Sequence, residues 1–66
     1  NIRKHVGANV RHFREQKGWS QEELADRADF HRTYVSGIER GIRNPTLTVL
    51  KRLSDALECS MADLVS

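Results

Sequence analysis

The sequence predicts an all-α domain. Apolar residues recur every three or four positions through nearly the whole chain, which is the period of one helix face. Hydroxyl side chains precede several of these runs, at the position where they cap a helix. No segment of useful length alternates apolar and polar residues, so we expect no sheet. A chain of 66 residues has room for a single domain, which we assign to residues 1–66.

The first helix is predicted from an apolar stripe formed by Ile2, Val6, Val10 and Phe13. We expect it to end at Gly18. Ser20 and Glu23 then have the spacing of a capping box, in which the hydroxyl accepts from the amide of Glu23 and the carboxylate returns to the amide of Ser20. A second helix therefore starts at Gln21.

The second and third predicted helices are short and follow one another closely. The second ends near residues 27–28, because Phe30 falls outside its apolar rhythm. After a break of about three residues, Val35 and Ile38 form the apolar side of a third helix with a polar outer face. Gly41 ends that helix, since glycine accepts the left-handed conformation that closes helices.

Two more helices complete the chain. Thr46 can cap a fourth helix, whose regular stripe consists of Leu47, Leu50, Leu53 and Leu57. Ser60 and Asp63 outline a weaker capping box that opens a short fifth helix. The expected architecture is therefore a compact bundle of five helices.

Size and composition argue against several classes of protein. An enzyme pocket of roughly 300–1,000 Å³ would consume most of so small an interior, so we expect no catalysis. The single Cys59 cannot form an internal disulfide, which favours a cytoplasmic location. No apolar run approaches the ~20 residues of a membrane span. The histidines and Cys59 lack the compact spacing of metal ligands, so we expect no metal and no cofactor, and no small-molecule ligand is evident.

The second and third helices, over about residues 21–40, have the layout of a helix-turn-helix. Ala25 is small where the two helices would cross, and Val35 and Ile38 would hold the third helix against the core. Three polar residues then face outward, where they could reach base edges in a major groove: Arg32, Thr33 and Ser36. By spacing alone, an ordinary helical hairpin with a solvated face is an equal alternative, and a net charge of +2 is too small to decide.

Four motifs occur in order along the chain: Ser20-Gln-Glu-Glu-Leu-Ala25, Arg32-Thr-Tyr-Val-Ser36, Ile38-Glu-Arg-Gly41 and Arg43-Asn-Pro-Thr-Leu47. Together they resemble the lambda-repressor-like (Cro/Xre) DNA-binding family, and restriction-modification controller proteins in particular. The likeness extends from about Val6 to Leu64. It implies a five-helix, helix-turn-helix domain of a transcription regulator, whose recognition helix spans about residues 32–40.

The resemblance also implies roles for individual residues. Arg32 and Thr33 resemble the family's base-reading pair, with Ser36 one turn further along; arginine can bond guanine O6 and N7, and threonine can meet a thymine methyl. Gln21 resembles the residue that holds a backbone phosphate at the amino end of the second helix. Further phosphate contacts are implied for Tyr34, Arg40, Arg43 and Asn44.

Three positions depart from the family pattern. The turn glycine is Asp29 here, which tolerates a left-handed backbone better than most residues but less well than glycine. The usual serine at the start of the third helix is His31, a poor cap. Gly37 stands where the family often has a long reading residue, so it supplies no side chain for base readout and weakens the helix.

The resemblance further implies an ion pair between Arg14 and Glu39, which would tie the first helix to the end of the third. Two unrelated surface charges are the alternative. Trp19 and Phe30 border predicted helix ends, so we interpret them as core residues and not as platforms for stacked bases.

The resulting hypothesis is a regulator that binds double-stranded DNA as a homodimer on a two-fold operator, because one short helix contacts only a few base pairs. The candidate interface residues are Leu57, Met61, Leu64 and Val65, which could equally belong to the core. The alternative function is an antitoxin-like protein-interaction module built on the same bundle. RNA binding is disfavoured, since the A-form major groove excludes a helix.

Overall fold

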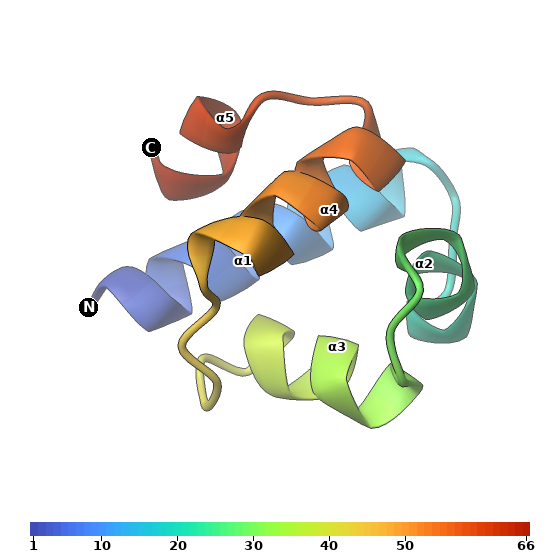
Figure 1. Ribbon diagram of the computed structural model, residues 1–66, viewed down its shortest axis with the longest axis horizontal. Helices are drawn as coiled ribbons and strands as arrows, with labels where there is room; N and C mark the ends of the chain where they lie inside the picture. Colours follow the sequence, from blue (N-terminus) through green and yellow to red (C-terminus); the bar gives the residue numbers. More distant parts are fainter.

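The computed structural model describes residues 1–66 and contains five helices and no strand. They are α1 (Ile2–Gln16), α2 (Gln21–Ala28), α3 (Arg32–Glu39), α4 (Leu47–Leu57) and α5 (Met61–Val65). Figure 1 shows α1 running behind α4, with α2 and α3 on one side of this pair and α5 on the other. None of the helices combines the length and the apolar character that a membrane span requires. The predicted five-helix architecture is confirmed.

The helix caps explain why the helix starts could be read from the sequence. The hydroxyls of Ser20 and Thr46 accept hydrogen bonds from main-chain amides three residues later, at 3.0 and 3.2 Å. Ser60 and Asp63 form a complete capping box. The predicted box at Ser20 is only half formed, because the carboxylate of Glu23 pairs with Arg27 on the next turn of α2, at 2.7 Å.

All five helices contribute to one core of eleven buried residues. Leu57 and Leu64 are 2% and 0% exposed and are covered by the protein's own helices. Of the two roles expected for them, core or dimer interface, the structure supports the core, and the interface assignment is corrected accordingly. Met61 is half-buried and Val65 is 42% exposed, so only these two of the four expected residues reach the surface of α5. The expected apolar stripe of α4 is also corrected at Leu47. This residue is 74% exposed, and the buried stripe begins one turn later, at Leu50.

Close backbone contact fixes the position of α3 against α1. A Cβ added at Gly7 would lie 2.3 Å from the carbonyl oxygen of Ile38 and 2.7 Å from that of Glu39. Any side chain at position 7 would therefore push the carboxyl end of α3 away from α1. Together with the buried Val35 and Ile38, this contact sets the position of α3 against the core.

The turn between α2 and α3 has the left-handed residue that the sequence predicted. Asp29 closes α2 at φ 61° and ψ 50°. Arg52 of α4 supports the turn, because its Nη2 atom donates to the carbonyls of Ala28 (2.9 Å) and Asp29. Its guanidinium also lies 4.0 Å from the ring centre of Phe30. The turn is thus held by a residue more than twenty positions away.

Candidate nucleic-acid interface

Helix α3 buries its apolar side and exposes its polar side. Val35 and Ile38 are both 0% exposed, whereas Arg32 and Thr33 are exposed and Ser36 is half-buried. The three expected base-reading residues therefore lie on the outer side of a helix whose orientation is fixed by the core. His31 precedes the helix and makes no side-chain cap, as expected.

A network of hydrogen bonds joins the ends of α1, α2 and α3 at Glu39. Arg14 donates to this carboxylate through Nε (2.7 Å) and Nη2 (3.0 Å), and its Nη1 donates to the carbonyl of Trp19 (2.8 Å). The Arg14 and Glu39 side chains are 12% and 3% exposed, so the predicted ion pair is present and nearly buried. Its hydrogen bonds raise the pKa of the Arg14 guanidinium, against the opposing effect of burial.

Gln21 belongs to the same network. Its Nε2 atom donates to Glu39 Oε1 at 3.1 Å, and the residue is half-buried at the start of α2. The side chain expected to hold a phosphate is therefore positioned by a residue of α3. Sequence reasoning found the pair of Arg14 and Glu39 but missed this third member, because nothing in the local pattern of α2 indicates a bond to a residue eighteen positions away.

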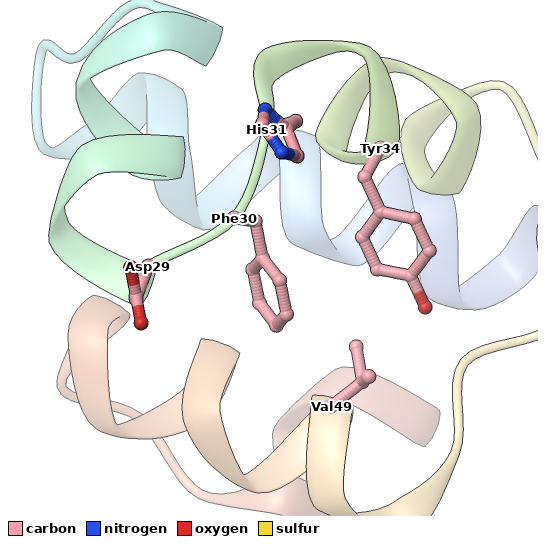
Figure 2. Close-up of a pocket in the computed structure, with 5 residues that line it drawn as sticks. All are labelled: Asp29, Phe30, His31, Tyr34 and Val49. Carbon is pink, nitrogen blue, oxygen red and sulfur yellow. The ribbon is translucent and has the colours of Figure 1, made fainter.

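Tyr34 lies on the flank of α3 and is half-buried. Its ring centre is 5.3 Å from that of Phe30, and Figure 2 shows both rings pointing toward Val49 of α4. Together with Asp29 and His31 they line an open surface pocket of about 340 Å³. Phe30 is packed partly against the core, as is Trp19, in agreement with their interpretation as core residues.

The remaining expected phosphate contacts gather at the carboxyl end of α3. Arg40, Arg43 and Asn44 are all exposed, and the guanidinium of Arg43 lies 5.7 Å from the ring centre of Tyr34. The loop is fixed to α3 through the carbonyl of Gly37, which accepts from the amides of Ile42 (2.9 Å) and Arg43 (3.2 Å). Gly37 itself is buried, so this position lies beneath the loop and not on the open face of α3.

The structure brings together no group of three His, Cys, Asp or Glu side chains that could hold a metal ion. What it does assemble is a polar helix face with exposed cations at its carboxyl end. This arrangement can donate hydrogen bonds to base edges and to phosphate oxygens, which are the two kinds of contact that proteins make with duplex DNA.

Comparison with known proteins gives a consistent set of similarities. The helix-turn-helix family model HTH_3 matches residues 10–64. The control protein C.BamHI of Bacillus amyloliquefaciens is 47% identical over 66 residues, covering 98% of this chain and 82% of that protein. The crystal structure of the hypothetical transcription factor NHTF from Neisseria has a TM-score of 0.96 at 39% identity, covering 100% of this chain and 76% of that one. The biofilm regulator SinR, solved in complex with DNA, has a TM-score of 0.88 at 34% identity, covering 92% and 98%.

Proposed function

Because the chain belongs to the helix-turn-helix family HTH_3, we propose that it is a sequence-specific DNA-binding regulator of transcription that places α3 in the major groove. The observation that carries this proposal is the division of α3 into a fully buried apolar side and an exposed polar side that begins with Arg32 and Thr33. An ordinary solvated hairpin would show the same division, and the match of the helix-turn-helix family to residues 10–64 is what favours DNA binding over it.

In this proposal, Arg32, Thr33 and Ser36 contact bases. Arg32 and Thr33 are the first two residues of the recognition helix, whose amino-terminal residues contact base edges in this motif, and Ser36 follows one turn later on the same outer side. Arg32 can donate two hydrogen bonds to one guanine, which makes it the main determinant of sequence preference. Thr33 can contact a thymine methyl, and Ser36 can bond either a donor or an acceptor.

The phosphate contacts flank this face. Gln21 lies at the amino end of α2, where unpaired amides and the helix dipole favour an anion. The other four proposed phosphate contacts lie on α3 and in the segment after it: Tyr34, Arg40, Arg43 and Asn44. Such contacts fix the position of α3 on the duplex without reading its sequence.

We further propose a homodimer in the cytoplasm, without a catalysed reaction. One eight-residue helix can contact only a few base pairs, so two copies on half-sites about 10–10.5 base pairs apart would supply the needed selectivity. The surface of α5 that contains Met61 and Val65 is the proposed contact, since Leu57 and Leu64 are occupied in the core.

Selection of bound fragments from random duplex DNA tests this function. We expect an enriched sequence with two-fold symmetry, bound at least about 10³-fold more tightly than a scrambled duplex. Arg32→Ala should lose about 1–3 kcal/mol on the selected duplex and far less on the scrambled one. No enrichment, together with binding unaffected by salt, would contradict the proposal and favour the protein-interaction alternative.

A further inference from the structure

The cations of this chain divide into two groups. Six of the eleven lysines and arginines form ion pairs with carboxylates: Arg11, Arg14, Lys17, Arg27, Lys51 and Arg52. The other five are in no ion pair: Arg3, Lys4, Arg32, Arg40 and Arg43. Three of these five lie on α3 or in the loop after it, within the proposed DNA interface. The remaining two, Arg3 and Lys4, lie in the first turn of α1, outside the proposed DNA interface.

Lys4 lies against the point where α3 ends. A Cβ added at Gly41 would be 2.6 Å from Lys4 Cγ and 3.0 Å from Lys4 Cα, so the stem of the lysine crosses the backbone of Gly41. Gly41 adopts φ 76°, a conformation that also favours glycine. Figure 1 shows the carboxyl end of α3 and the following loop on the same side of the molecule as the amino end of α1. Lys4 is therefore a neighbour of the segment that carries Arg40 and Arg43.

The first turn of α1 is electrostatically unfavourable within the chain itself. The amino end of a helix carries partial positive charge and is normally complemented by acidic residues, as α2 is by Glu22 and Glu23. The first turn of α1 has no acidic residue but contains Arg3 and Lys4, both exposed. An anionic partner would neutralise these unpaired positive charges. The neighbouring loop after α3 carries Arg40 and Arg43, which are proposed to contact DNA phosphates, so a phosphate is the anion expected here as well.

We propose that Lys4 binds a DNA phosphate, with Arg3 adding to the local positive charge, so that the DNA-binding surface continues from the loop after α3 onto the first turn of α1. This inference rests on the proposed function. The occupant is the duplex backbone, because the patch is continuous with the loop after α3, which carries the proposed phosphate contacts Arg40 and Arg43, and has the complementary charge. A phosphate contact carries no sequence information, so Lys4 contributes equally to binding of any duplex.

The test compares Lys4→Gln with Lys51→Gln, which makes the same change of charge at an exposed, ion-paired position of α4 whose side chain is 64% exposed. Binding of each variant to the selected duplex and to a scrambled duplex is measured between 50 and 200 mM salt. Each phosphate contact contributes about −0.9 to the slope of log affinity against log salt. Lys4→Gln should make this slope less steep by about that amount on both duplexes, whereas Lys51→Gln should leave it unchanged.

Arg32→Ala serves as the third arm, and thermal unfolding of each variant shows that it is folded. If Arg32→Ala loses selectivity but Lys4→Gln has the same slope as Lys51→Gln, the proposed function stands and the phosphate contact of Lys4 is wrong. If the wild-type protein binds neither duplex in a salt-dependent way, both the proposed function and this inference are overturned.

Discussion

The stem of Arg43 lies across Gly37. A Cβ added at Gly37 would be 2.8 Å from Arg43 Cγ, 3.5 Å from its Nε and 3.7 Å from its Cδ. The absence of a side chain at this position of α3 therefore leaves room for an arginine that comes from the following loop. The position of the exposed Arg43 side chain therefore depends on having glycine at position 37.

Replacing Gly37 by alanine should separate helix stability from DNA binding. Alanine is favoured over glycine inside a helix by about 0.8–1 kcal/mol, but its methyl would displace Arg43. We expect Gly37→Ala to unfold within about 1 kcal/mol of the wild-type free energy and to bind duplex DNA as weakly as Arg43→Ala. Urea unfolding and fluorescence titration measure the two quantities. Additive losses in the double variant would show that Gly37 does not act through Arg43.

The helix starts could be predicted because their signals are local. Ser20, Thr46 and Ser60 each accept a bond from an amide three residues away, and this spacing is visible in the sequence. The polar face of α3 was predicted for the same reason, since Val35 and Ile38 define its buried side.

Contacts between distant segments could not be predicted in the same way. Periodicity places Leu47 and Leu57 on one stripe of α4, but it does not say which end of the stripe is covered by other helices; Leu47 is 74% exposed and Leu57 is 2% exposed. Arg52 under the turn, Gln21 on Glu39 and Arg43 over Gly37 all join segments whose proximity depends on the assembled bundle. The roles of the base-reading and phosphate-binding residues remain predictions.

Substitutions at Asp29 measure how much the left-handed backbone conformation of the turn costs in free energy of unfolding. A residue with a Cβ is disfavoured at φ 61°, although aspartate adopts this region more readily than most. We expect Asp29→Gly to raise the free energy of unfolding by about 1 kcal/mol or less. Asp29→Ala is the matched control, because it removes the same carboxylate while keeping a Cβ, and it should be destabilising. Equal losses in both variants would show that the carboxylate, and not the backbone conformation, determines stability here.

The surface of α5 can be tested without disturbing the core. A charge at Leu64, which is 0% exposed, would unfold the domain, so Val65→Glu is the informative change. Sedimentation of the wild-type protein across a dilution series should show self-association that Val65→Glu weakens at least tenfold. Leu47→Glu is the control, since it alters another exposed apolar residue at the first turn of α4. Loss of association only in Leu47→Glu would place the contact at α4 instead.

The ion pair of Arg14 and Glu39 should couple stability to DNA binding. With side chains 12% and 3% exposed, it resembles a buried pair more than a surface pair, and removing one partner of a buried pair can cost about 3–5 kcal/mol. The carboxylate also holds Gln21, and the pair fastens the end of α3 to α1, so either loss should change the position of the recognition helix. A double-mutant cycle with Arg14→Met and Glu39→Gln should give a coupling of at least about 0.5 kcal/mol in urea unfolding.

Each single variant should also bind the selected duplex more weakly. The control is Arg11→Met, which breaks an exposed ion pair on the same helix. Additive losses within about 0.3 kcal/mol would mean that the two side chains do not act together, and unchanged DNA binding would show that the orientation of α3 is fixed by its apolar contacts alone.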